Sequence, residues 1–218
     1  MPTQNRAELV SFQGWILRAH RSVAKPCRLL VLVHGRTGDE DSMWVFARNL
    51  PRDYWIVAPR APYPALSSGY SWVPTSSGSG EHAGLDDLRT SADALVAVLD
   101  AYASQHQLQA HQFDIIGFSE GAALASTVAL TYPGRIRRLA MLAGFVPDGV
   151  EDVLPSQPLD GVPVFVAHGT LDDLVGIDQA HRSVAMLQQA GAQVAFCEAE
   201  IGHKVSAACL RGLDRFFA

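Results

Sequence analysis

One stretch of the chain, residues 113–123, joins a strand-like run to a helix-like run through a short glycine motif. It begins with apolar, partly β-branched residues and ends with small residues that favour a helix. Between them lies Gly117-Phe118-Ser119-Glu120-Gly121. In this setting a Gly-x-Ser-x-Gly pattern indicates a sharp turn from a buried strand into a helix, with the serine hydroxyl projecting from the end of a sheet. Both glycines are expected because a side chain at either position would collide with the neighbouring strand or helix.

The length and composition predict a single domain over residues 1–218. With 48% hydrophobic and 18% charged residues, the chain can bury a sizeable core. The net charge of -5 is spread along the sequence without a basic run, which argues against a nucleic-acid partner. No apolar run reaches membrane-spanning or signal-peptide length, so we expect no stable membrane insertion and a cytoplasmic location. The sequence does not predict whether the protein is a monomer or an oligomer.

The three cysteines, Cys27, Cys197 and Cys209, are an odd number without metal-like spacing. Such a set fits buried thiols in a reducing compartment better than a disulfide framework. We therefore expect no metal site and three reduced thiols.

Strand-like and helix-like segments alternate from about residue 28 to the end. Strands are predicted at 8–12, 14–18, 27–33, 54–58, 113–118, 138–143, 162–168 and 193–198, and helices from residue 41 or 42, over 85–102, from 119, over 177–190 and over 205–217. Residues 60–84 and 148–161 are predicted loops, the first packed by its aromatic residues. The alternation predicts an α/β fold: a mostly parallel sheet with helices on both faces. The binding crevice of such a sheet lies at the carboxyl edge of its strands.

A serine nucleophile needs an imidazole to take its proton and a carboxylate to orient that imidazole. His203 follows the last predicted strand and is the best candidate base. His20, His82, His106, His111 and His181 have no distinctive setting, and we interpret them as surface or packing residues. His168 is interpreted as a structural residue that braces the loop after it.

The acid is expected on the loop after the preceding strand, where Asp172 and Asp173 are adjacent. One of them is predicted to be catalytic and the other solvated or helix-capping. With either one, the chain order is serine, aspartate, histidine, as in hydrolases whose serine lies on a strand-to-helix turn.

When a serine attacks a carbonyl group, the carbonyl oxygen becomes an oxyanion, which backbone N–H donors stabilise. Two such donors are expected near Ser119. Glu120 follows the serine at the start of a helix, and Arg36 lies on the loop after the strand that ends near residue 33. We predict their N–H groups as the donors. The Arg36 side chain could alternatively bind an anion.

Taken together, these motifs resemble those of the phospholipase/carboxylesterase family, the compact α/β-hydrolases that are similar to acyl-protein thioesterases. The matching stretches are Leu32-Val33-His34-Gly35-Arg36-Thr37-Gly38-Asp39, Ala58-Pro59-Arg60-Ala61-Pro62, Gly69-Tyr70-Ser71-Trp72, Gly117-Phe118-Ser119-Glu120-Gly121, Ala143-Gly144-Phe145-Val146-Pro147, His168-Gly169-Thr170-Leu171-Asp172 and Gly202-His203. They occur in order over most of the chain. The family's His-Gly-x-x-Asp pattern selects Asp172 over Asp173 as the acid.

The resemblance implies an α/β-hydrolase without a large cap domain that cleaves short- to medium-chain acyl esters through Ser119, Asp172 and His203, without a cofactor. We predict Tyr70, Trp72 and Phe145 as walls of the substrate pocket. Glu120 departs from the family, in which a neutral residue is common after the serine. Its charge is expected to disfavour anionic substrates.

Two other functions remain open. The first is a thioesterase or lysophospholipase, which would use the same residues on another small acyl substrate. The second belongs to another class, a non-catalytic binding protein with the hydrolase fold. The usual sign of that class is a missing catalytic residue, and here all three candidates are present.

Overall fold

The computed structural model describes residues 7–74 and 83–218. It contains an eight-stranded sheet of order β1-β2-β4-β3-β7-β8-β9-β10. The strands, in chain order, are β1 (Glu8–Phe12), β2 (Trp15–His20), β3 (Arg28–Val33), β4 (Tyr54–Pro59), β7 (Phe113–Phe118), β8 (Ile136–Leu142), β9 (Pro163–Gly169) and β10 (Gln193–Ala199). The strands from β4 to β10 in this order pair in parallel, whereas β2 pairs antiparallel with both β1 and β4.

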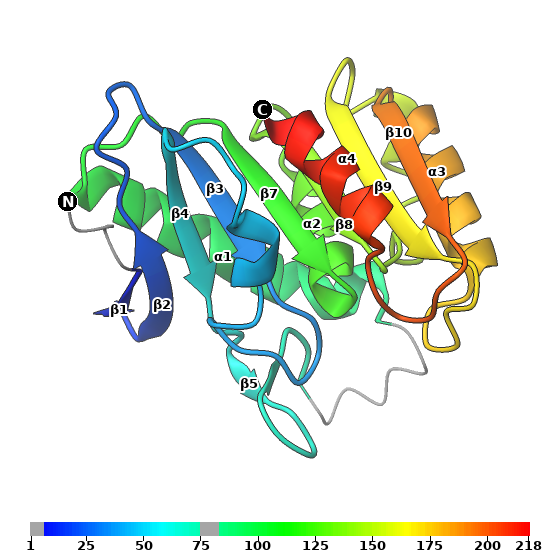
Figure 1. Cartoon of the computed structure of the whole chain (residues 1–218), viewed down its shortest axis with the longest axis horizontal. Coiled ribbons are helices and arrows are strands. Elements are labelled where there is room, and N and C mark those ends of the chain that lie inside the picture. Colours follow the sequence, from blue (N-terminus) through cyan, green and yellow to red (C-terminus); the bar gives the residue numbers. More distant parts are fainter. Residues whose placement is uncertain (1–6, 75–82) are drawn as a thin grey trace.

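Helices cover both faces of the sheet, as α4 in front of it and α1 and α3 behind it show (Figure 1). The helices are α1 (Leu85–Gln105), α2 (Glu120–Thr131), α3 (Ile177–Gln189) and α4 (Ala207–Phe217). Residues of α1, α2 and α3 share one buried cluster with alternate residues of β3, and α4 shares a second cluster with the other residues of β3. Because both faces are buried, β3 reads as a continuous apolar run. The predicted α/β fold, a mostly parallel sheet with helices on both faces, is confirmed.

The helix predicted from Asp41 or Ser42 is wrong, because that segment forms only the short 3₁₀ helix η1 (Trp44–Ala47). The Asp39 carboxylate accepts the N–H of Asp41 at 3.0 Å and the Ser42 hydroxyl at 2.8 Å, a local turn that competes with helix formation.

The predicted loop 60–84 includes a two-stranded hairpin, β5 (Tyr63–Pro64) and β6 (Tyr70–Ser71). Part of this loop, with His82, lies outside the described residues. In the second predicted loop, 148–161, the chain forms a single 3₁₀ turn, η2 (Leu154–Ser156).

The expectation of three reduced thiols is also wrong. Cys197 of β10 and Cys209 of α4 form a disulfide, with their Cα atoms 5.7 Å apart, and Cys27 is free. The spacing of 12 residues gave no signal because it is the packing of α4 against β10 that brings the two side chains together. The cytoplasmic prediction rested partly on reduced thiols and stays a prediction.

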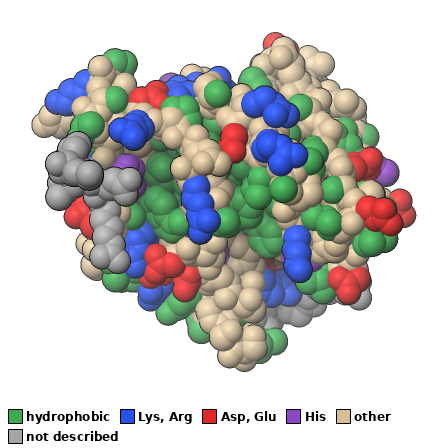
Figure 2. Space-filling view, in the orientation of Figure 1, with side chains coloured by type: hydrophobic (Ala, Val, Ile, Leu, Met, Phe, Trp, Pro, Cys, Tyr) green, Lys and Arg blue, Asp and Glu red, His purple; other side chains and the backbone are tan. Residues whose placement is uncertain are grey.

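On the face in Figure 2, basic and acidic side chains are interspersed, in line with the lack of a basic run in the sequence. In the described ranges, 7–74 and 83–218, no helix is both long and apolar enough to cross a membrane.

Candidate active site

Ser119 lies at the turn between β7 and α2 with φ 54° and ψ -122°, a conformation that is strained for a residue with a side chain. The glycines on either side permit this turn, as expected. A Cβ atom on Gly117 would lie 2.2 Å from the carbonyl oxygen of Gly121. One on Gly121 would lie 2.3 Å from the carbonyl oxygen of Val33, at the end of β3. Close backbone packing thus holds Ser119 at the carboxyl edge of the sheet.

His203 and Asp172 come from the loops after β10 and β9. The Nδ1 atom of His203 is 2.8 Å from Oδ2 of Asp172. The other carboxylate oxygen accepts the N–H groups of Leu174 at 3.0 Å and Val175 at 2.9 Å. A carboxylate only accepts, so Nδ1 carries the hydrogen and Nε2 of His203 is left as a proton acceptor. The neighbouring Asp173 is exposed and makes none of these contacts.

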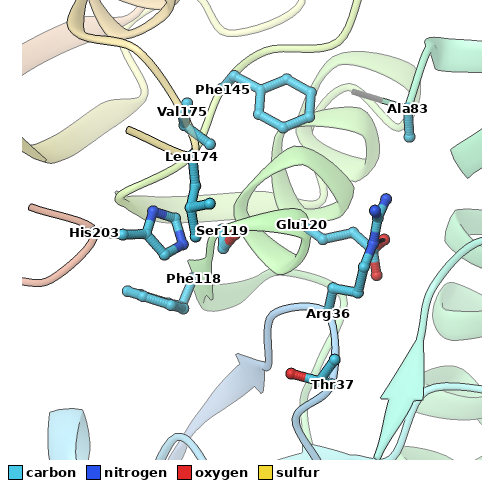
Figure 3. Close-up of a pocket in the computed structure, with 10 residues that line it drawn as sticks. All are labelled: Arg36, Thr37, Ala83, Phe118, Ser119, Glu120, Phe145, Leu174, Val175 and His203. Carbon is cyan, nitrogen blue, oxygen red and sulfur yellow. Dashed lines mark hydrogen bonds and ion pairs between the residues drawn. The ribbon is translucent and has the colours of Figure 1, made fainter. Parts of the chain in front are cut away.

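Ser119 and His203 line the same cavity, which has a volume of about 480 Å³. In Figure 3 the His203 ring lies beside Ser119, at the opposite side of the pocket from Arg36. The described residues that line the cavity are Arg36, Thr37, Ala83, Phe118, Ser119, Glu120, Phe145, Leu174, Val175 and His203.

The two predicted oxyanion donors flank the serine. A Cβ atom on Gly35 would be 3.1 Å from Cβ of Ser119, so the loop after β3 packs directly against the serine. Glu120 is the first residue of α2, and its N–H has no acceptor one turn earlier in the helix. Within the described chain, the N–H of Arg36 makes no hydrogen bond either. Both groups are available to a bound oxyanion.

The Glu120 side chain points away from His203 and toward Arg36 (Figure 3). The Nε atom of Arg36 donates to its Oε1 at 2.9 Å, and the backbone N–H of Trp72 donates to its Oε2 at 2.8 Å. The Ser71 hydroxyl lies 3.1 Å from each oxygen. This carboxylate is therefore buried, hydrogen-bonded and paired with a cation.

Of the three predicted pocket walls, only Phe145 is among the described lining residues. Trp72 is completely buried in the core, where its Nε1 donates to the carbonyl of His34 at 2.7 Å. Tyr70 accepts a hydrogen bond from Arg60 at 3.1 Å. Leu174 and Val175 also line the cavity and were not predicted from the sequence, although both follow Asp172 on the same loop.

Two buried histidines hold the loops of the site. Nε2 of His34 accepts the N–H of Ala61 at 3.0 Å, so its Nδ1 carries the hydrogen that is donated to the carbonyl of Gly35 at 2.8 Å. Burial lowers the pKa of His34, which keeps the ring neutral. Nε2 of His168 lies 2.8 Å from the Val175 carbonyl oxygen, so this ring braces the loop that bears Asp172, as predicted.

No group of three metal-ligating residues occurs in the part of the chain that the structure describes.

This chain is similar to several known proteins. The family model described as Phospholipase/Carboxylesterase matches residues 19–218. An acyl-protein thioesterase 1 of Debaryomyces hansenii is 24% identical over 189 residues, which cover 78% of this chain and 81% of that protein. Among solved structures, a carboxylesterase from Mesorhizobium loti has a TM-score of 0.83 at 23% identity and covers 97% of this chain and 98% of its own.

The Bacillus cereus carboxylesterase has a TM-score of 0.79 at 18% identity, with 94% of each chain covered. Structures at this level of identity show the fold, whereas the family match extends over almost the whole chain. The chain therefore belongs to the phospholipase/carboxylesterase family of α/β-hydrolases.

Proposed function

We propose that this protein is a serine hydrolase that cleaves short- to medium-chain carboxylic esters through an acyl-enzyme on Ser119. Nε2 of His203 removes the proton from the Ser119 hydroxyl as its oxygen attacks the ester carbonyl. The N–H groups of Arg36 and Glu120 stabilise the oxyanion of the tetrahedral intermediate. When the intermediate collapses, the C–O bond to the alcohol breaks and His203 gives its proton to the leaving oxygen.

Water then hydrolyses the acyl-enzyme by the same steps. His203 takes a proton from the water, whose oxygen attacks the acyl carbonyl. Collapse of the second intermediate releases the acid and returns the proton to Ser119. These steps need only side chains and backbone groups of this chain, so we propose no cofactor.

The observation that carries this proposal is the 2.8 Å hydrogen bond from His203 to buried Asp172, beside a cavity that His203 shares with Ser119. The hydrogen bond fixes the tautomer that a general base requires.

The size and walls of the cavity favour substrates of modest length. Its volume of about 480 Å³ is in the lower part of the range for small-molecule sites. Phe118, Phe145 and Leu174 provide an apolar wall for an acyl chain. We therefore propose a small acyl ester as the substrate, with Phe145 as a pocket wall.

A thioesterase is the second candidate, because the relative from Debaryomyces hansenii is an acyl-protein thioesterase. The chemistry at Ser119 would be the same, with a thiol in place of the alcohol as the leaving group. Rates over a chain-length series of p-nitrophenyl esters and of acyl thioesters separate the two functions. A strong preference for long-chain lipids would contradict the small-ester proposal.

A fluorophosphonate probe tests the nucleophile. We expect the wild type and a Ser67→Ala control to be labelled and Ser119→Ala to remain unlabelled, because Ser67 is exposed and does not line the pocket. Equal labelling of Ser119→Ala and the wild type would exclude Ser119. A wild type that binds an intact ester tightly and hydrolyses no activated ester would instead be a binding protein.

A further inference from the structure

The Arg36 guanidinium occupies one side of the cavity with only part of its hydrogen-bonding capacity in use. Its Nε donates to Glu120, while about half of the side chain, 49%, stays exposed. A guanidinium has five N–H donors, and four of them are on the two outer nitrogens, Nη1 and Nη2. In residues 7–74 and 83–218, neither outer nitrogen donates a hydrogen bond, and the ion pair of Arg36 is with Glu120.

The pairing with Glu120 fixes the orientation of this guanidinium. The Glu120 carboxylate is itself held by the Ser71 hydroxyl and the Trp72 N–H, so it is a rigid partner. The outer end of the guanidinium extends past that carboxylate in the direction of Ala83, a lining residue (Figure 3). Two outer nitrogens held in this way form a fork whose geometry matches a carboxylate.

The charges around the cavity favour an anion at this fork. Arg36 is the only lysine or arginine among the described lining residues, and Glu120 is the only acidic one. Glu120 is buried, and its oxygens accept hydrogen bonds from the neutral donors Ser71 and Trp72 as well as from Arg36, so the guanidinium is not the only group that stabilises this carboxylate. The sequence-based expectation that the Glu120 charge disfavours anionic substrates is the opposite prediction, and it stays a prediction.

We propose that Arg36 determines substrate specificity by binding a carboxylate group of the substrate through Nη1 and Nη2. The preferred substrates are then esters that carry a free carboxylate a few bonds from the ester bond, such as half-esters of dicarboxylic acids. This inference rests on the proposed esterase function and adds the chemical class of the substrate.

The test compares monoethyl with diethyl esters of succinate and adipate, whose hydrolysis is followed by acid release at pH 8. The readout is the preference ratio, the kcat/KM for the monoethyl ester divided by that for the diethyl ester. It is measured for the wild type, Glu120→Gln, the double variant Arg36→Gln/Glu120→Gln, and Arg52→Gln. The double variant avoids leaving Glu120 as a buried unpaired charge. Arg52 is the matched charge control. It is an exposed arginine just before the amino end of β4, whereas the pocket lies at the carboxyl ends of the strands.

We expect Glu120→Gln to keep or raise the preference ratio, because the guanidinium remains and the competing carboxylate is neutralised. The double variant should lower the ratio by about tenfold or more relative to Glu120→Gln, as expected for a lost charge-assisted hydrogen bond. Arg52→Gln should match the wild type. Added salt should lower the ratio only where Arg36 is present, because the fork is partly exposed.

Equal preference ratios in Glu120→Gln and the double variant, with diethyl ester hydrolysis retained, would overturn this inference alone. A wild type that hydrolyses neither the diethyl esters nor p-nitrophenyl acetate would instead overturn the proposed esterase function. A ratio that falls as much in Arg52→Gln as in the double variant would show a general charge effect and likewise reject the carboxylate fork.

Discussion

The Nδ1 atom of His203 lies 2.8 Å from Oδ2 of Asp172, and the two residues are on the loops that follow the neighbouring strands β10 and β9. The carboxylate cannot turn freely, because its other oxygen accepts the N–H groups of Leu174 and Val175. Parallel pairing of the two strands brings the loops together, and the loop hydrogen bonds then aim the carboxylate. The imidazole is held with Nε2 free to accept a proton.

Asp172→Asn is expected to lower kcat by about 10³–10⁴-fold with little change in KM, because an amide can hold the imidazole in the wrong tautomer. Initial rates with p-nitrophenyl acetate measure this effect. Asp173→Asn is the matched control, since Asp173 is adjacent but exposed, and it should retain nearly full activity. A larger loss in Asp173→Asn than in Asp172→Asn would reverse the assignment of the acid.

The free energy of unfolding is expected to fall in mildly acidic solution because of His34. Burial lowers the pKa of His34 in the folded state, whereas the unfolded chain titrates near 6.5. Below about pH 6.5 the unfolded state therefore binds a proton that the folded state does not, and stability decreases until the lower folded-state pKa is reached. For this one group the slope is at most about 1.4 kcal/mol per pH unit.

Urea unfolding of the wild type and His34→Gln between pH 7.5 and 5.5 measures this slope. The variant should be less stable at pH 7.5, because one glutamine amide does not reproduce both hydrogen bonds of the buried ring, to Ala61 and Gly35, and its stability should depend less steeply on pH. Burial also lowers the pKa of His106. This group therefore makes the free energy of unfolding fall with decreasing pH in both proteins. Identical slopes in the two proteins would contradict the assignment to His34.

Patterns local in sequence predicted the strands, the long helices and the turn at Ser119, because burial on one or both faces produces a readable periodicity. The position of His203 after the last strand also followed from this alternation. The choice between Asp172 and Asp173 did not, since both have the same local context, and the resemblance to a family had to decide it.

Contacts between distant segments could not be predicted. Glu120 binds Ser71 and Trp72, 49 and 48 positions away, and nothing in either segment indicates this pairing. Trp72 was predicted as a pocket wall because aromatic residues in loops often bind ligands. In the structure its side chain is instead packed in the core. The disulfide arises in the same way, from the packing of a helix on a strand.

Gly121→Ala is expected to destabilise the protein by about 1–3 kcal/mol and to abolish most activity. The added Cβ would lie 2.3 Å from the backbone of Val33, so α2 or the loop after β3 would have to move. Gly176→Ala is the control, because a Cβ there has nothing within 4 Å. Thermal unfolding and ester hydrolysis measured on both variants compare them directly. An active, fully stable Gly121→Ala protein would show that the turn at Ser119 is looser than the structure indicates.

The disulfide between Cys197 and Cys209 encloses the loop that bears His203, since β10 precedes that loop and α4 follows it. Thiol titration of the denatured protein should therefore detect one free thiol, that of Cys27, without reductant and three after reduction.

We expect the double variant Cys197→Ser/Cys209→Ser to unfold at a lower urea concentration, with a free energy of unfolding that is smaller by about 2–4 kcal/mol. We expect kcat to fall as well, because the base becomes less well positioned. Cys27→Ser is the control and should change neither quantity appreciably. Three free thiols in protein purified without reductant, together with unchanged stability of the double variant, would contradict this prediction.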